Sequence, residues 1–590
     1  MSQPSVSEII EAALGKRRLT LFIKNVDVLN VFSGEILRSG IGVYRDRIVY
    51  VGDEVRDADE VIDGDGAIAV PGLIDTHLHI ESSMITPARF AEAVLPRGTT
   101  TVCADPHEIA NVLGKEGVRM MLENGRGLPL KIYFFAPTCV PESQAVTAGA
   151  EITPEDVEEM LGWDGIVGLG EVMDYEGVLS NSPKMIRMIE IGHRRGAVID
   201  GHCVLLSGAR LNAYAAAGPE ADHENFTVET ALEKLRAGMY LKLRGPYILD
   251  VKKFIAELKK LPNPWNIILV TDDVMPDNLR ETGHLDHVIR AVIEAGMDPV
   301  EAVRSATLRP ALHMRMFNLG AIAPGKVADI VLLRSLEKFS VSMVIADGRV
   351  VAKDGRLVVE IPERRFDRRA LDTVKLLALS ERDFEVKPPI QNGKVAVNAI
   401  DFASYSGELE NPAAAFLEMI LTRIGRVEIE VRDGRFVLDN IALVLVFERH
   451  GKTGGRGVGF ARNLIKQGAI ASTVAHDAHN LIVVGTDTRD MHRAASLVIE
   501  SRGGIAAVKN SKVLAKIELP VAGLMSEENF ETIAEKMKNL RRAFKEMGVL
   551  DHPYMPLPNL LTLSVIPHAR ITDKGIFDVN QQKFVPWLAE

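Results

Sequence analysis

The pair His77 and His79, in the segment Asp75-Thr-His-Leu-His79, is the clearest chemical feature of this 590-residue sequence. The two histidines end an apolar, strand-like run, and residues i and i+2 of a strand point to the same face. Both imidazoles can therefore reach one metal ion. A lone pair of this kind is more often incidental, so its meaning depends on what ends the neighbouring strands.

Further potential ligands end other strand-like runs, namely Glu171, His202, His223 and Asp272. Four imidazoles and two carboxylates suit one or two divalent ions of Mn, Fe or Zn, and a ligand set without thiolates argues against a closed structural zinc site. We expect Glu171 to bridge two ions, and Asp272 to bind one ion and to orient and deprotonate the nucleophile. The alternatives are that Glu171 only orients a histidine and that Asp272 caps a helix.

Two further groups of polar residues could hold an additional ion or hydrogen-bond a substrate. Asp105, His107 and Glu108 follow the second strand-like run, and His476 and His479 lie in the C-terminal segment TVAHDAHN. The alternatives are a helix cap for the first group and an internal polar network for the second. The second group follows a glycine-rich run, HGKTGGRGVG, that lacks the first glycine of a phosphate-binding loop, so we do not expect nucleotide triphosphate binding.

The elements that must position these residues predict an α/β fold with three domains. Residues 71–319 alternate eight strand-like runs with amphipathic stretches, which is typical of a (β/α)8 TIM-type barrel with its catalytic groups at the carboxyl ends of the strands. The sixth run, ending near residues 222–223, is the weakest. Short strands and turns at 1–70 and 320–375 predict one small composite β-sandwich, with the barrel inserted between its two parts. Residues 376–590 mix strands with a charged helix and predict a C-terminal α+β domain.

Composition excludes several other classes of protein. The 80 acidic and 69 basic residues are dispersed and give a net charge of −11, which does not indicate nucleic-acid binding. No apolar run approaches the roughly 18 residues that span a bilayer, and the N-terminus lacks the order of a secretory signal. The three cysteines are far apart and predict no disulfide framework. We expect a cytoplasmic homo-oligomer, a dimer, without nucleic-acid or membrane partners.

Several of these segments resemble a known group of enzymes. Over residues 19–370 the sequence is similar to the amidohydrolase superfamily, in the segments Pro71-Gly-Leu-Ile-Asp-Thr-His-Leu-His79 and Gly320-x4-Gly325-Lys-x2-Ala-Asp329 and in the strand-end residues His202, His223 and Asp272. Over nearly the whole chain it resembles the adenine deaminase family, in the segments His79-Ile-Glu-Ser-Ser83, Arg97-Gly-Thr-Thr100, Asp105-Pro-His-Glu-Ile-Ala-Asn111 and His476-Asp-Ala-His-Asn480.

The resemblance implies a metal-dependent barrel that converts adenine to hypoxanthine and ammonia in purine salvage. It implies that a metal-bound hydroxide attacks C6, that a ring nitrogen gains a proton, and that ammonia leaves with proton delivery through Asp272. The metal ligands it implies are His77, His79, His202, His223 and Asp272. Many binuclear amidohydrolases carry a carboxylated lysine where this sequence has Glu171, which counts against a hydantoinase or dihydroorotase.

Two alternatives to this function stay open at the level of the sequence. The first is another binuclear amidohydrolase that acts on a cyclic amide or an N-acyl substrate. The second is a non-catalytic amidohydrolase-like scaffold, which is disfavoured because such scaffolds typically lose metal ligands and this chain keeps all of them.

Overall fold

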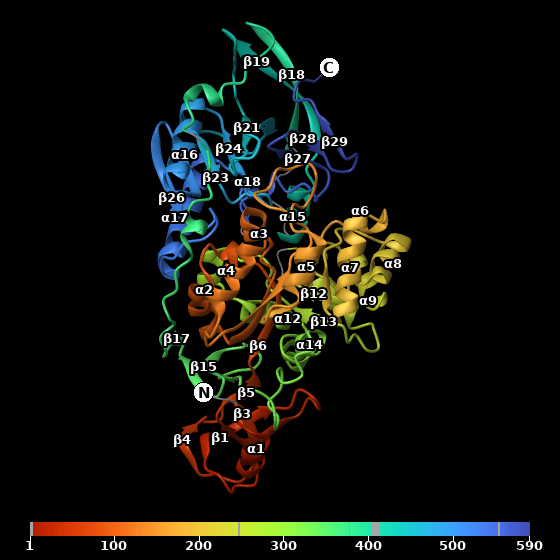
Figure 1. Cartoon of the computed structure of the whole chain (residues 1–590), viewed down its shortest axis with the longest axis vertical. Helices are drawn as coiled ribbons and strands as arrows, with labels where there is room; N and C mark the ends of the chain where they lie inside the picture. The colour runs from red at the N-terminus through yellow and green to blue at the C-terminus, as the bar shows by residue number, and fades with distance from the viewer. Residues whose placement is uncertain (1–3, 246–247, 377, 403–411, 553–554, 590) are drawn as a thin grey trace.

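The computed structural model describes residues 4–245, 248–376, 378–402, 412–552 and 555–589. Three regions follow one another along the long axis of the molecule (Figure 1). The N-terminal strands lie at one end, a ring of helices around parallel strands lies in the middle, and a second large sheet lies at the other end near the C-terminus. Among the described residues, no helix combines the length and the hydropathy needed to cross a bilayer.

The first region is a nine-stranded sheet built from two segments that are far apart in the sequence. Strand β14 (Ile330–Leu333) pairs antiparallel with β5 (Ile68–Pro71), so the chain returns to its N-terminal strands after the middle region. The strand order is β17-β16-β15-β14-β5-β1-β2-β3, with β4 paired to β1. The other strands are β1 (Leu19–Leu29), β2 (Ile36–Tyr44), β3 (Arg47–Gly52), β4 (Ala58–Asp63), β15 (Val341–Ala346), β16 (Arg349–Lys353) and β17 (Arg356–Leu357).

The middle region has a TIM-barrel-type fold, and all eight predicted strands are present in the predicted order. Strands β6 to β10 form a parallel sheet, and β11 to β13 form a second one. A parallel bridge between Leu78 and Asp272 links the first strand to the segment after the last. The sixth strand has only two residues, which accounts for its weak signal in the sequence. The strands are β6 (Leu73–Leu78), β7 (Thr99–Ala104), β8 (Lys131–Ala136), β9 (Ile166–Val172), β10 (Val198–Gly201), β11 (Ala221–Asp222), β12 (Tyr240–Leu243) and β13 (Ile267–Leu269).

Amphipathic helices cover these strands, and α7 (Pro183–Arg195) shows why they form. Proline is tolerated at its first position, Met185, Met188 and Ile189 form a buried stripe, and the left-handed Gly196 ends the helix. Others between the strands are α2 (Pro87–Val94), α3 (His107–Leu113), α4 (Lys115–Gly125), α5 (Pro154–Met160), α8 (Gly208–Ala217), α9 (Val228–Arg236) and α10 (Val251–Leu258). The last barrel strand is followed by α11 (Pro276–Glu281) and α12 (Leu285–Glu294).

The C-terminal region centres on a nine-stranded sheet of order β20-β19-β18-β22-β21-β24-β23-β25-β26. Strand β21 (Ile441–Phe447) is the longest apolar run, and alternation sorts it between two cores: Leu443 and Leu445 enter one and Val444 and Val446 the other. The other strands are β18 (Gly393–Asp401), β19 (Ile424–Arg432), β20 (Arg435–Phe436), β22 (Arg456–Arg462), β23 (Ala469–Ser472), β24 (Leu481–Gly485), β25 (Gly504–Lys509) and β26 (Lys512–Glu518).

Several helices and a small sheet complete the C-terminal region, and the shorter helices are α15 (Pro412–Ile420) and α18 (Leu557–Leu560). Helix α16 (Thr488–Glu500) packs on β23 to β25, and α17 (Phe530–Met547) packs both on β26 and on α11 of the barrel. Strands β27 (Ala569–Thr572), β28 (Gly575–Asp578) and β29 (Lys583–Val585) form the small sheet, whose first two strands pack against β22. The C-terminal region is therefore docked on the barrel through α17 and α11, and it extends beyond the barrel along the long axis of the molecule (Figure 1).

Candidate metal centre and its roof

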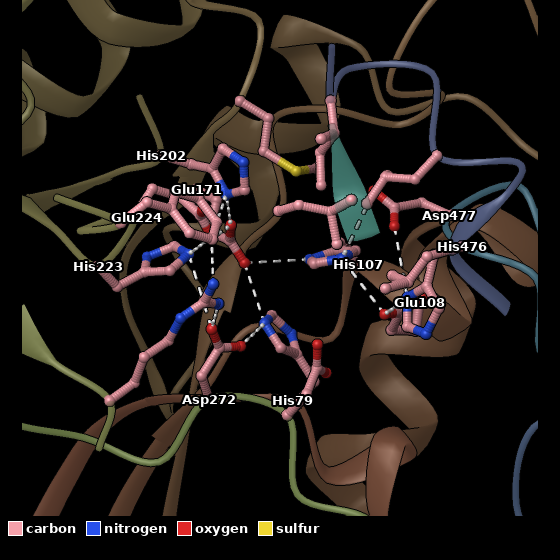
Figure 2. Close-up of a pocket in the computed structure, with 18 of the residues that line it drawn as sticks. His79, His107, Glu108, Glu171, His202, His223, Glu224, Asp272, His476 and Asp477 are labelled. Carbon is pink, nitrogen blue, oxygen red and sulfur yellow. Dashed lines mark hydrogen bonds and ion pairs between the residues drawn. The ribbon is translucent and has the colours of Figure 1, made fainter. Parts of the chain in front are cut away.

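The strand-end histidines converge on the two oxygens of Glu171, and Figure 2 shows three of them, His79, His202 and His223. Oε1 lies 3.0 Å from Nε2 of His79 and 3.6 Å from Nε2 of His77. Oε2 lies 2.7 Å from Nδ1 of His202 and 3.3 Å from Nε2 of His223. One carboxylate oxygen thus faces the first histidine pair and the other faces the second, which is the arrangement that a bridge between two ions requires.

Asp272, which follows the eighth barrel strand, completes this group of histidines and carboxylates. Its Oδ1 lies 3.3 Å from Nε2 of His79 and 3.8 Å from Nε2 of His77. The residue has a φ of 60°, in the left-handed region that aspartate enters more readily than most side chains. The nearest helix, α11, has Met275 at its N-cap, so the Asp272 carboxylate faces the histidines rather than capping that helix.

The donor atoms at this centre fit divalent metal ions. Within the described part of the chain, Nε2 of His77 and Oε1 of Glu171 are buried atoms with no hydrogen-bond partner. Buried polar atoms are nearly always satisfied, and a cluster of orphaned imidazole and carboxylate atoms is what metal ligands present. Several triads have ligand atoms within 4.8 Å of one another, among them His77–His79–Glu171, Glu171–His202–His223 and His77–His223–Asp272.

A second layer of residues fixes the orientation of the first histidine pair. Nδ1 of His77 lies 3.0 Å from Oδ2 of Asp200, which also accepts a hydrogen bond of 2.6 Å from Nζ of the buried Lys242. Nδ1 of His79 lies 3.0 Å from the carbonyl oxygen of Asp105. With both Nδ1 atoms held as donors, each Nε2 is left with its lone pair toward the centre.

Burial and the carboxylates act in opposite directions on these histidines. Burial, reinforced by the neighbouring His223, lowers the pKa of His77 to about 3, so this ring is neutral and can donate a lone pair. For His79, burial alone would lower the pKa, but the adjacent Glu171 carboxylate outweighs it and raises the pKa to about 10. Excess negative charge at the centre therefore favours a cation there, and a metal ion can supply that charge in place of a proton.

Sequence reasoning missed several charged residues at the centre, among them Glu224 and Arg244. Arg244 donates to Oδ2 of Asp272, and its Nη2 lies 2.9 Å from Oε1 of Glu224. Both carried a usable signal, because Glu224 directly follows His223 and Arg244 ends the seventh strand-like run, MYLKLR. Applying the strand-end rule to every strand would have found them.

The polar residues predicted outside the barrel strands meet above the centre, although up to 371 positions separate them. Glu108 pairs through Oε2 with Nε2 of His479, and its Oε1 lies 2.7 Å from Nδ1 of His476. His107 lies between the two groups, with Nδ1 3.7 Å from Oε1 of Glu171 and Nε2 3.8 Å from Oδ2 of Asp477. The C-terminal region therefore roofs the barrel mouth (Figure 2).

One cavity lies between the centre and this roof, and most of the predicted residues line it. Three predicted residues are not among those that line the cavity, namely His77, Asp105 and His479. Asp105 instead accepts a 2.8 Å hydrogen bond at Oδ2 from the backbone N–H of Glu171. The apolar part of the wall comes from both regions, and such residues carry no signal in a sequence that distinguishes them from core positions. They are Met173, Phe226, Phe416, Ile420, Leu560, Leu563 and Ile566.

Comparisons with known proteins agree with a hydrolytic metal centre in a barrel. Residues 68–351 match the family described as "Amidohydrolase family", and residues 419–583 match "Adenine deaminase C-terminal domain". The adenine deaminase of Thermosipho africanus is 39% identical over 99% of this chain and 100% of its own length. Those of Kosmotoga olearia and Moorella thermoacetica are each 40% identical over 98% of this chain and cover 98% and 97% of their own lengths. The chain belongs to the adenine deaminase family of the amidohydrolases.

Proposed function

We propose that this enzyme hydrolyses adenine to hypoxanthine and ammonia at the centre around Glu171. The observation that carries the proposal is the Glu171 carboxylate, whose two oxygens face two separate histidine pairs in the mouth of an amidohydrolase barrel. The adenine deaminases that match the chain over its full length indicate the substrate.

Two divalent ions, Mn, Fe or Zn, are the proposed cofactors, with His77, His79, His202, His223, Glu171 and Asp272 as their ligands. The buried, orphaned donor atoms at this centre support the ligand set. When bound, such ions supply Lewis acidity, which makes a water molecule nucleophilic near neutral pH. Imidazole and carboxylate ligands accept all three metals, so availability in the cell selects among them.

Asp272 is the proposed proton carrier of the reaction. Its Oδ1 faces the histidines, where it can accept a proton from the attacking water, and its Oδ2 is held by Arg244. A guanidinium beside one oxygen fixes the direction of the carboxylate. The same carboxyl group then delivers the proton to the exocyclic nitrogen of adenine, which leaves as ammonia.

The finer architecture is also a proposal. Residues 1–70 and 320–375 form a composite β-sandwich, 71–319 a closed eight-stranded barrel inserted into it, and 376–590 a C-terminal domain of adenine deaminase type. The shared first sheet and the bridge between Leu78 and Asp272 support this division. The proposed setting is purine salvage in the cytoplasm by a homodimer without nucleic-acid or membrane partners, and light scattering of the purified protein tests the dimer.

An ammonia-release screen tests the proposed function. Protein loaded with Mn, Fe or Zn is offered adenine, adenosine, guanine and cytosine, and hydrolysis of a cyclic amide and an N-acyl amino acid is followed in parallel. Turnover of adenine well above the others is expected. If adenine is not turned over by metal-replete protein, the proposal is wrong, and turnover of the cyclic amide or N-acyl substrate would support the other class of amidohydrolase.

A further inference from the structure

The turn between β23 and β24 presents two buried polar atoms to the cavity, opposite the metal centre. They are Nε2 of His476 and Oδ2 of Asp477, which have no hydrogen-bond partner among the described residues. Both residues line the cavity, and their exposed fractions are only 4% and 2%. Unsatisfied buried polar atoms beside a binding cavity are sites where a ligand makes hydrogen bonds.

The cluster of His476, His479 and Glu108 has the composition of a metal site, but its hydrogen bonds argue otherwise. The backbone N–H of Ala475 donates to Nδ1 of His479 over 3.2 Å, so that nitrogen carries a lone pair. The proton of the neutral ring is then on Nε2, where it is donated to Oε2 of Glu108. A nitrogen that bears a proton cannot ligate a metal, so His479 holds Glu108 in place.

Glu108 in turn orients His476. Its Oε1 lies 2.7 Å from Nδ1 of His476, which leaves the opposite nitrogen, Nε2, without a hydrogen-bond partner among the described residues in a side chain that lines the cavity. Oδ1 of Asp477 lies 3.6 Å from the same Nδ1. Burial would lower the pKa of His476, but the charge of Glu108 outweighs it and raises the pKa well above its usual value, so Nε2 bears a hydrogen-bond donor.

The turn is held rigidly from both regions of the molecule. The backbone N–H of His476 donates to the carbonyl of Asn559 over 3.0 Å, and the hydroxyl of Thr562 donates to the carbonyl of His476 over 2.7 Å. The amide of Asn480 reaches across to the carbonyl of Thr147 in a barrel loop over 2.9 Å. The donor at His476 and the acceptor at Asp477 are therefore preorganised, as a specificity site requires.

Asp477 lies beyond His107 as seen from Glu171, on the side of the cavity away from the metal centre. One imidazole, that of His107, separates Oε1 of Glu171 from Oδ2 of Asp477, with a contact of under 4 Å on either side. The edge of adenine farthest from its amino-bearing C6 carries N3, an acceptor, beside N9, which bears a hydrogen in the free base. A donor and an acceptor on adjacent residues are the complement of that edge.

We infer that Asp477 accepts the N9 hydrogen of adenine while His476 donates to N3, so that the C-terminal region selects the free base over nucleosides. This inference rests on the proposed deamination of adenine and extends it to substrate selection. A ribose on N9 removes the hydrogen and places bulk against a buried carboxylate. Sites built around a buried hydrogen bond reject substrates that lack it far more strongly than apolar pockets do.

Adenine and 9-methyladenine distinguish the role of Asp477. The wild type is expected to have a kcat/KM for 9-methyladenine at least about 100-fold below that for adenine. In Asp477→Ala the value for adenine falls about 100-fold, and the two substrates come within about fivefold of each other. The control is Asp439→Ala, a change at an exposed position of the same region, which should leave the ratio unchanged.

His476 is tested with 3-deazaadenine as a competitive inhibitor, because loss of N3 also alters reactivity at C6. In His476→Ala the KM for adenine is expected to rise about tenfold, while the Ki of 3-deazaadenine stays within about threefold of the wild-type value. A merely structural effect would weaken both ligands equally. Thermal unfolding and elemental analysis of each variant should match the wild type.

Three outcomes would overturn the inference. They are equal use of adenine and 9-methyladenine by the wild type, an unchanged preference in Asp477→Ala, and loss of a metal ion from His476→Ala or His479→Ala. If the wild type releases no ammonia from adenine at all, the proposed function itself fails, and that result is distinct from all three.

Discussion

The two polar clusters that face each other across the cavity are built from the same residue types but have different hydrogen bonding. In the barrel, Nδ1 of His77 and of His79 is occupied by oxygen atoms, which leaves both Nε2 lone pairs toward Glu171. In the roof, the proton of His479 is committed to Glu108. For His77, His79 and His479, the partner of the second ring nitrogen therefore decides whether the ring can bind a metal through Nε2.

The two clusters also suit two different functions, metal-ion chemistry in the barrel and recognition of the base in the roof. The barrel centre concentrates negative charge and orphaned ligand atoms, as chemistry with metal ions requires. The roof presents one donor and one acceptor beside apolar walls, as recognition of a planar base requires. The predictions that follow ask whether substitutions on the two sides affect metal content and substrate preference separately.

Glu171→Gln is expected to have the largest effect. The amide keeps the shape of the side chain but loses the charge that can hold two ions, so kcat/KM for adenine should fall by about 1,000-fold, the equivalent of roughly 4 kcal/mol. Elemental analysis should show reduced metal content. Glu190→Gln, at an exposed position of α7, is the matched control. A variant with wild-type metal content and activity would show that Glu171 does not bridge the ions.

Asp200→Asn tests whether the second layer sets the metal affinity. The carboxylate lies 3.0 Å from Nδ1 of His77 and accepts from Lys242, so its loss should make His77 a poorer ligand. A decrease of 10- to 100-fold in metal affinity is expected, which is typical for residues that orient metal-bound histidines. Titration of apoprotein with Mn²⁺ measures it, and excess metal should restore most of the activity. An unchanged affinity for Mn²⁺ would show that Asp200 does not contribute to metal binding through His77.

The sequence allowed more of the barrel side to be predicted than of the roof, for a physical reason. Parallel strands bring their carboxyl ends to one rim, so the positions of His77, His202 and Asp272 imply their proximity once the strands are recognised. No comparable rule brings Glu108 to His479 across two regions of the chain. Which nitrogen of His479 bears the proton depends on the N–H of Ala475, which only the folded backbone supplies.

Glu108→Gln is expected to affect the roof side alone. Glutamine keeps one acceptor for His479 but removes the charge that orients His476. The KM for adenine should rise about tenfold with a smaller change in kcat, the pattern of weakened substrate binding. Metal content, measured on the same preparation, should equal that of the wild type. Loss of an ion would mean that the roof cluster contributes to metal binding as well as to substrate binding.

Arg541→Met is expected to have the smallest effect on catalysis, because it weakens the docking of the two regions without touching either cluster. Arg541 on α17 donates to Asp277 on the barrel helix α11 and to Asp551, with contacts of 3.0 Å or less. Removing the guanidinium leaves two largely buried carboxylates without this partner, at a cost of about 2 kcal/mol in the free energy of unfolding, less than for a fully buried pair.

Because α11 and α17 remain packed in Arg541→Met, kcat/KM should stay within about threefold of the wild type. The preference for adenine over 9-methyladenine should not change, since the turn carrying His476 is held by its own hydrogen bonds. Denaturant unfolding and the two-substrate assay measure these quantities, and a lost preference would mean that selection depends on docking rather than on the local turn.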